Sequence, residues 1–216
     1  MSSIVIAAHH SLISDLSVLI NFPEDYYQVM LEKLKESLLE VPIIKKGDYS
    51  YFIHPLADGI PQIEAELLNE VTDEIVKRLP PCDLLLTPEA MGIPLATAVS
   101  LKTGLPFSII RKKSYGLPQE LCIKQQTGYA QSLMYINGVQ AGQRVVIIDD
   151  IISTGGTLRA IISMLKEHGV EVAGVIVLFN KAQGAEKTSQ DLGINIEPLI
   201  DVEVVNEQLQ VLPSGQ

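Results

Sequence analysis

Hydrophobic and polar positions follow two rhythms along this chain. From about residue 63 onward, short stretches that are apolar on both faces, such as DLLLT at 83–87, alternate with segments whose apolar residues recur every three or four positions. The first pattern predicts buried strands and the second predicts amphipathic helices. The predicted strands are 83–87, 106–112, 144–150, 170–179 and 194–204. The predicted helices are 63–79, 93–104, 157–169 and 185–193. This alternation predicts βαβ units and a parallel sheet covered by helices on both sides.

The first 60 residues follow a different pattern. An amphipathic helix is predicted from Pro23 to Glu40. Its apolar face is formed by Tyr27, Met30, Leu31, Leu34, Leu38 and Leu39. Residues 45–61 carry turn signals around a short strand. Residues 1–22 are predicted to be an accessory segment that packs on the body or on a partner chain.

One long connection interrupts the alternation of strands and helices. Residues 112–142 are polar and carry several glycines and a proline. A connection of this length inside a compact α/β domain is usually functional, often as a lid over a site. We therefore expect residues 113–137 to form a flexible loop that closes over a ligand.

Composition narrows the class of protein. The chain has 216 residues, 47% of them hydrophobic, and a formal net charge of −10. Length and composition predict a globular chain, with residues 23–216 as a single domain. The acidic balance argues against a nucleic-acid binder, which needs a basic surface. No apolar run reaches the ~18 residues of a membrane span, and the isolated thiols Cys82 and Cys122 suit a reducing cytoplasm better than a zinc cluster. We expect a cytoplasmic protein that binds neither nucleic acid nor membranes.

The strongest chemical signal is VVIIDDIISTGGT at 145–157. Four apolar strand residues lead into Asp149 and Asp150, and the loop Ser153–Thr157 then opens a helix. Glycines let backbone N–H groups approach an anion, hydroxyls add donors, and a helix N-terminus is partly positive. Carboxylates beside such a loop suit hydroxyl groups or a hydrated Mg²⁺. The pattern indicates a ribose 5-phosphate ligand; the alternative is an ordinary capped turn between a strand and a helix.

Other nucleotide-binding motifs are absent from the sequence. No glycine is followed by lysine, so there is no G-x-x-x-x-G-K-[ST] loop, and there is no G-x-G-x-x-G. A P-loop NTPase or a dinucleotide-dependent oxidoreductase would lack its usual phosphate-binding loop.

Taken together, these residues resemble a known family. VVIIDDIISTGGT matches, at all thirteen positions, the phosphoribosyl pyrophosphate (PRPP) motif of the type I phosphoribosyltransferases. The resemblance extends over about Val41–Val205. TPEAMGIPLATAVS looks like the pyrophosphate loop of the purine enzymes, and SIIRKKSYGLP resembles the entry to their flexible loop. Together with YFIHPLADGIP and LGINIEPLIDVEV, these motifs look closest to the archaeal-type hypoxanthine (guanine) phosphoribosyltransferases.

The resemblance implies a fold and a set of partners. The implied fold is a five-stranded parallel α/β sheet flanked by helices, with a small hood and a flexible loop. The hood would be contributed by about 41–62 and 180–205. The implied substrates are PRPP and a purine base, with Mg²⁺ as cofactor and usually a homodimer as the assembly.

The resemblance also implies roles for individual positions. The residues that would bind the 5-phosphate are Ser153, Thr154, Gly155, Gly156 and Thr157. The residues that would bind pyrophosphate are Glu89, Ala90, Met91, Gly92, Arg111, Lys112 and Lys113. The catalytic residues would be Asp149 and Asp150, which hold the ribose hydroxyls and, directly or through water, Mg²⁺.

Two of these assignments have a simpler alternative, and one further residue is a weaker candidate for binding the base. Arg111–Lys113 is equally consistent with a solvated surface run. Glu89 is also suited to cap the helix that starts near Gly92. Phe179, at the end of a predicted strand, is a candidate to stack on the base; the alternative is a core aromatic.

The function implied is a purine-salvage transferase. It would convert hypoxanthine or guanine and PRPP to IMP or GMP and pyrophosphate, through an oxocarbenium-like transition state. Adenine is the alternative base, but adenine enzymes commonly have an arginine where Met91 stands, and a Glu-Tyr pair where this chain has Thr127-Gly128-Tyr129. A PRPP-binding regulator without catalysis is the alternative from another class. A DNA-binding regulator is disfavoured because residues 1–40 have only two basic side chains, Lys33 and Lys35.

Overall fold

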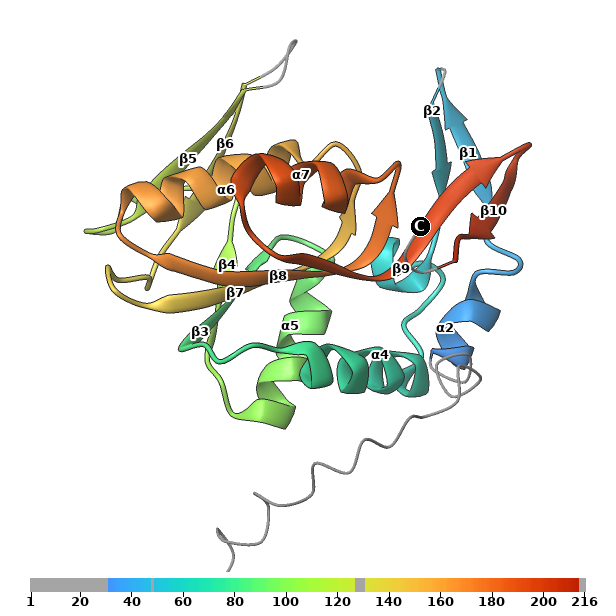
Figure 1. Ribbon diagram of the computed structural model, residues 1–216, viewed down its shortest axis with the longest axis horizontal. Coiled ribbons are helices and arrows are strands. Elements are labelled where there is room, and N and C mark those ends of the chain that lie inside the picture. Colours follow the sequence, from blue (N-terminus) through green and yellow to red (C-terminus); the bar gives the residue numbers. More distant parts are fainter. Residues whose placement is uncertain (1–30, 48, 127–130, 214–216) are drawn as a thin grey trace, which may run out of the picture. The chain divides into compact units, whose positions relative to one another are not determined.

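The computed structural model describes residues 31–47, 49–126 and 131–213 (Figure 1). The accessory segment predicted for 1–22 and the first part of the helix predicted from Pro23 lie outside the described residues. Residues Leu31–Gln216 form one compact unit.

A six-stranded sheet with the order β10-β9-β8-β7-β3-β4 forms the centre of this unit. Its strands are β3 (Leu84–Pro88), β4 (Phe107–Ile110), β7 (Arg144–Ile152), β8 (Glu171–Lys181), β9 (Ile196–Val205) and β10 (Gln208–Val211). The first five of these are parallel to one another, which confirms the expected five-stranded parallel sheet. β10 pairs antiparallel with the edge strand β9 and was not predicted, because four residues are too few to show a period.

Helices cover both faces of the sheet (Figure 1). α4 (Ala65–Arg78) and α5 (Gly92–Thr103) lie on one face, and α6 (Gly156–Glu167) and α7 (Gly184–Leu192) lie on the other. Side chains of a strand point alternately to its two faces. Along β7, Val145 and Ile147 join the core under α6, whereas Val146 and Ile148 join the core under α5. A strand buried on both faces has to be apolar throughout, which is why its sequence shows no alternation.

The described part of the helix predicted to run to Glu40 ends earlier than expected. Within residues 31–40, α2 covers Glu32–Ser37. Leu34 and Leu38 are buried as predicted, but Leu39 is 80% exposed. The prediction for Leu39 was wrong because the helix ends before it, and helical spacing no longer places its side chain on the buried face.

A four-residue helix follows the first hairpin, α3 (Pro55–Asp58), and it is capped by a buried histidine. His54 Nδ1 accepts a hydrogen bond from the N–H of Leu56 at 3.1 Å, and its Nε2 lies 2.9 Å from Ser37 Oγ. Because Nδ1 accepts, the neutral ring carries its proton on Nε2 and donates it to the hydroxyl. Burial lowers the pKa of His54 to about 4. The histidine is therefore structural.

Two antiparallel hairpins lie outside the central sheet. The first consists of β1 (Ile43–Lys46) and β2 (Tyr49–Phe52), and it is joined to β8 by a 2.7 Å hydrogen bond from Lys181 Nζ to the carbonyl of Ser50. The second consists of β5 (Leu121–Gln126) and β6 (Gln131–Ile136). It occupies much of the connection that the sequence pattern left without regular structure. Three apolar side chains fix it to the core on the side of α6, namely Ile123, Met134 and Ile136.

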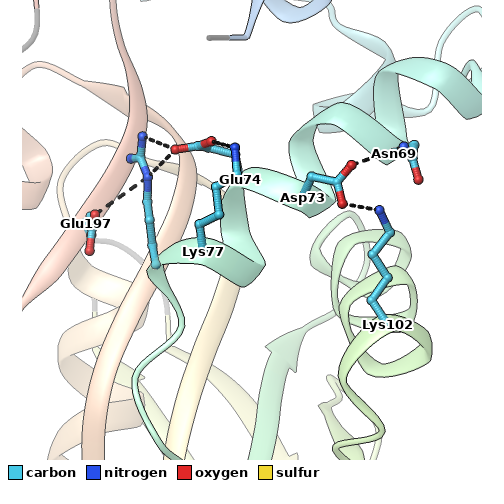
Figure 2. Close-up of polar contacts among 7 residues, drawn as sticks. Asn69, Asp73, Glu74, Lys77, Lys102 and Glu197 are labelled. Atoms are coloured by element: carbon cyan, nitrogen blue, oxygen red, sulfur yellow. Dashed lines mark hydrogen bonds and ion pairs between the residues drawn. The ribbon is translucent and has the colours of Figure 1, made fainter. Parts of the chain in front are cut away.

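Charged side chains fasten α4 to its neighbours (Figure 2). Glu74, whose side chain is only 6% exposed, pairs with Arg78 at 2.9 Å and with Lys77 at 3.2 Å. Arg78 also donates to the carbonyl of Pro198 in β9 at 3.0 Å. On the other side of α4, Asp73 pairs with Lys102 of α5. These contacts hold α4 against both the sheet and the adjacent helix.

Candidate functional site

The site lies where the order of strands reverses. Along the chain, β3 is followed by β4 on one side in the sheet and by β7 on the other. The loops that leave the carboxyl ends of β3 and β7 therefore diverge and leave a crevice between them, where open α/β sheets bind ligands. β3 ends one residue before Glu89, and Asp149 and Asp150 lie near the end of β7.

A cavity of about 300 Å³ opens at the carboxyl end of β7. Its lining residues are Tyr51, Phe52, Asp149, Ile151, Ile152, Ser153, Thr154, Gly155, Gly156, Thr157, Leu158 and Lys181. All five residues assigned to the 5-phosphate are among them. Gly155 adopts φ +71°, a left-handed conformation, as the N-cap of α6. The loop thus presents backbone N–H groups and the positive end of a twelve-residue helix to one cavity.

The two neighbouring carboxylates face different surroundings. Asp149 lines the cavity, and its Oδ1 accepts a 3.0 Å hydrogen bond from the N–H of Asp150. Burial raises the pKa of Asp149 well above its usual value, and the charge of Asp150 adds to the shift. Burial also raises the pKa of Asp150, with a further contribution from the carboxylate of Asp58 in α3. Such a pair of desolvated acids suits ligand hydroxyls or a cation as partners.

Glu89 connects the loop after β3 to the end of β4. Its Oε1 accepts a 2.8 Å hydrogen bond from the N–H of Lys112, and its Oε2 lies 4.0 Å from Arg111 Nη1. The alternative in which Glu89 caps α5 does not describe this contact, because the N-cap residue is Met91. The Glu89–Ala90 peptide bond is cis.

Some of the residues assigned to pyrophosphate lie together at the carboxyl ends of β3 and β4. The structure brings Glu89 together with Arg111 and Lys112, and α5 begins at Gly92. None of these residues is among those that line the 300 Å³ cavity. Lys113 points elsewhere, with its ammonium 5.7 Å from the ring centre of Tyr115. Thr127-Gly128-Tyr129 lies outside the described residues.

Phe179 occupies the core position that was its alternative. It is fully buried, and its ring makes edge contacts with Phe52 at 5.3 Å and His54 at 5.0 Å between ring centres. Phe179 is not among the residues that line the cavity.

Sequence reasoning placed Tyr51, Asp58 and Lys181 only within the hood segments 41–62 and 180–205, and gave Asp58 and Lys181 no role in the site. Tyr51 and Lys181 line the cavity, and the ammonium of Lys181 lies 5.9 Å from the ring centre of Tyr51. Lys181 had a recognisable signal, because it is the first charged residue after a long apolar strand whose carboxyl end faces the site. Tyr51 and Asp58 had none, since the hairpin and α3 reach the site only through tertiary packing.

The described part of the chain holds neither a ready-made metal cluster nor a membrane-spanning helix. Among its residues, no three side chains of His, Cys, Asp or Glu come together as a self-contained metal site. No helix within the described ranges is long and apolar enough to cross a membrane.

Comparison with known proteins agrees with this geometry. The family model of the phosphoribosyl transferase domain matches residues 55–212. The chain is 49% identical over 189 residues to the hypoxanthine/guanine phosphoribosyltransferase of Methanothermobacter thermautotrophicus, covering 86% of this chain and 98% of that protein. It is 47% identical over 184 residues to the protein of the same name from Methanohalophilus mahii, covering 85% and 96%. Among solved structures, the adenine phosphoribosyltransferase of Thermoanaerobacter pseudethanolicus matches with a TM-score of 0.67 and 27% identity, over 80% of this chain and 99% of that one.

Proposed function

This chain belongs to the phosphoribosyltransferase family, and from that premise we propose that it transfers phosphoribose from PRPP to hypoxanthine or guanine, releasing pyrophosphate. The relatives that carry this activity in their names match 85–86% of the chain at 47–49% identity. The observation that carries the proposal is the convergence of Ser153–Thr157 and Asp149 on one cavity at the strand-order reversal.

In this proposal each end of the sugar phosphate has its own partner. The N–H groups and hydroxyls of Ser153–Thr157 hold the 5-phosphate. The carboxylates of Asp149 and the adjacent Asp150, whose N–H donates to Asp149 Oδ1, accept hydrogen bonds from the ribose hydroxyls. Holding both ends fixes C1 of the ribose relative to the incoming base, and positioning of this kind is the main contribution a protein makes to such a reaction.

The carboxylates also fit a Mg²⁺ ion. Mg²⁺ in proteins is usually bound by one or two carboxylates together with water and substrate oxygens, and the described residues offer two adjacent desolvated acids rather than a closed cluster. Asp149 and Asp150 would hold it together with the oxygens of PRPP. When bound, the ion stabilises the negative charge that develops on pyrophosphate.

We assign the pyrophosphate end to the loop after β3. Arg111 supplies the cationic side chain there, while Glu89 keeps the strand end at Lys112 in place. Met91 brings no charge, so the basic residues of 111–113 have to balance the departing pyrophosphate. Arg111→Met should therefore raise the KM for PRPP more than Met91→Leu does, and equal effects of the two variants would contradict this assignment.

We assign the base to the side of the cavity formed by the hood, residues 41–62 and 180–205. Tyr51, Phe52 and Lys181 line the cavity there. An aromatic ring and an ammonium group offer a purine a stacking surface and a donor for a ring carbonyl oxygen.

We also propose that residues 113–137 close over the site and keep water from the reacting sugar. Large apolar side chains are exposed on this segment: Tyr115, Leu117 and Leu133. Because Ile123 and Met134 anchor the hairpin in the core, closure is expected mainly in the part before β5. Limited proteolysis should show protection of 113–120 by PRPP with Mg²⁺; cleavage at an unchanged rate would exclude closure.

Two further proposals concern the oligomeric state and the cellular compartment. We propose a homodimer that works in the cytoplasm, where the free thiols of Cys82 and Cys122 stay reduced. Sedimentation equilibrium tests the dimer, and a monomer at micromolar concentration would contradict it.

The test of the function is release of pyrophosphate from PRPP and Mg²⁺ with hypoxanthine, guanine, xanthine or adenine, each alone. Release with hypoxanthine or guanine, lost in Asp150→Asn and kept in the surface variant Asp73→Asn, supports the proposal. Release with adenine alone would move the assignment to the adenine enzymes, the activity named for the structural neighbour at 27% identity. Binding of PRPP without release for any base would indicate a regulator.

A further inference from the structure

One face of α7 packs against the proposed phosphate-binding loop. Three residues on this face, Gly184, Thr188 and Asp191, are spaced i, i+4 and i+7, which places them in line along a helix. A Cβ at Gly184 would lie 2.0 Å from the carbonyl oxygen of Ser153. The buried hydroxyl of Thr188 lies 1.9 Å from where a Cβ on Gly155 would be. The helix therefore supports the loop from the side away from the cavity.

Arg159, in the first turn of α6, connects Asp191 to the same loop. Its guanidinium donates to Asp191 Oδ2 through Nη2 at 2.6 Å and through Nε at 3.2 Å. Its Nη1 donates to the carbonyl oxygen of Thr154. The planar guanidinium can make these contacts together because its donors point in fixed, different directions.

These contacts orient two peptide groups. In a trans peptide the carbonyl of one residue and the N–H of the next point in opposite directions. The carbonyl of Ser153 points toward Gly184, so the N–H of Thr154 points away from α7. The carbonyl of Thr154 is held by Arg159, so the N–H of Gly155 also points away from that side. Thr154 and Gly155 both line the cavity, where adjacent N–H groups form an anion-binding concavity.

We propose that Arg159 and Asp191 are positioning residues for 5-phosphate binding, with the guanidinium fixing the loop peptides and the carboxylate fixing the guanidinium. The inference rests on the proposed phosphate role of Ser153–Thr157. Neither side chain lines the cavity. The side chains are 32% and 60% exposed, so the pair contributes little to stability, and its effect is on the geometry of the loop.

Kinetics and inhibition with ribose 5-phosphate and with pyrophosphate test the proposal in the full-length enzyme. Arg159→Met and Asp191→Ala should each raise the Ki of ribose 5-phosphate and the KM for PRPP by about tenfold, the effect expected when a hydrogen bond to a charged group is lost. The Ki of pyrophosphate should change less than about twofold. The control Arg144→Met breaks a similarly exposed pair with Glu171. This pair lies at the amino ends of β7 and β8, opposite the carboxyl ends that carry the loop, so the variant should change neither the Ki of ribose 5-phosphate nor the KM for PRPP.

Two further variants separate positioning from a direct charge effect. Arg159→Lys keeps the positive charge but replaces the planar guanidinium, whose three nitrogens contact Asp191 and the carbonyl of Thr154 in fixed directions, with a single ammonium nitrogen. The positioning role therefore predicts that this variant loses nearly as much affinity for ribose 5-phosphate as Arg159→Met. If the guanidinium instead bound the phosphate directly, Arg159→Lys would retain affinity and Asp191→Ala would increase it, and either result would overturn the inference. Unfolding temperatures confirm that the variants are folded.

The same measurements distinguish this inference from the proposed function. If the wild-type enzyme binds ribose 5-phosphate and Thr157→Val weakens that binding while Arg159→Met does not, only the positioning role fails. If the wild-type protein neither binds ribose 5-phosphate nor releases pyrophosphate, the proposed function itself fails.

Discussion

At the scale of single residues, the proposed phosphate loop depends on the absence of a side chain at position 155. Gly155→Ala would place a methyl group against Thr188 Oγ1 and force a β-carbon onto a left-handed backbone. We expect the KM for PRPP to rise by about tenfold or more, because the loop has to shift. Gly104→Ala is the matched control: its φ is +74° but nothing lies within 4 Å, so the left-handed backbone should cost about 1 kcal/mol of stability and leave the KM unchanged. If the two variants raised the KM for PRPP equally, the contact with Thr188 would not be the reason for the effect of Gly155→Ala.

His54 gives a pH-dependent contribution to stability. Its pKa is about 4 in the folded chain and 6.5 as the ordinary value, so the unfolded chain binds more protons between these limits. The contribution is fully present above pH 6.5 and is lost as the pH falls toward 4, by about 1.4 kcal/mol per pH unit. His54→Asn keeps an acceptor for the N–H of Leu56 and cannot titrate. In denaturant unfolding at several pH values, the free energy of unfolding of the variant should fall less between pH 6.5 and 4 than that of the wild type. An equal fall for both proteins would contradict the role of His54.

At the scale of elements, the attachment of α4 depends on one buried carboxylate. Glu74→Ala leaves Arg78 without its principal partner, and we expect the free energy of unfolding to fall by about 1–3 kcal/mol. Asp73→Ala removes a pair whose carboxylate is 52% exposed and should cost less than about 1 kcal/mol. Urea unfolding of both variants measures the difference, and an equal cost would mean that burial of Glu74 adds nothing.

At the scale of the whole molecule, the chain is longer than the relatives it matches. They align along 96–98% of their own length but cover only 85–86% of this chain. The family model begins at residue 55, so the additional residues fall mostly before it. We expect a variant lacking residues 1–22 to fold and to release pyrophosphate at a rate within about twofold of the full chain, because the site lies within the matched part. Loss of activity would show that the accessory segment contributes to the site or to the assembly.

The sequence predicted the parallel sheet and the loop because both depend on local patterns. Fully apolar strands such as 145–148 indicate burial on two faces. A glycine-rich loop between a strand and a helix indicates a backbone whose N–H groups can bind an anion. The pattern failed at Leu39, where a helix end changed the direction of the side chain, and at β10, which is too short to show a period. It also could not distinguish Phe179 in the core from Phe179 at a ligand.

By itself, then, the sequence determined the strand and helix order, because each element has its own local hydrophobic pattern. It also placed the proposed phosphate loop beside the carboxylate pair, because both lie within one stretch of about thirteen residues. Only the tertiary structure decided what stands around them. Lys181, Tyr51 and Asp58 reach the site from separate elements, and α7 reaches the loop across 30 or so residues of chain through close packing. Contacts of this kind leave no periodic signal, because their spacing along the chain is set by the sheet topology and not by the period of any helix or strand.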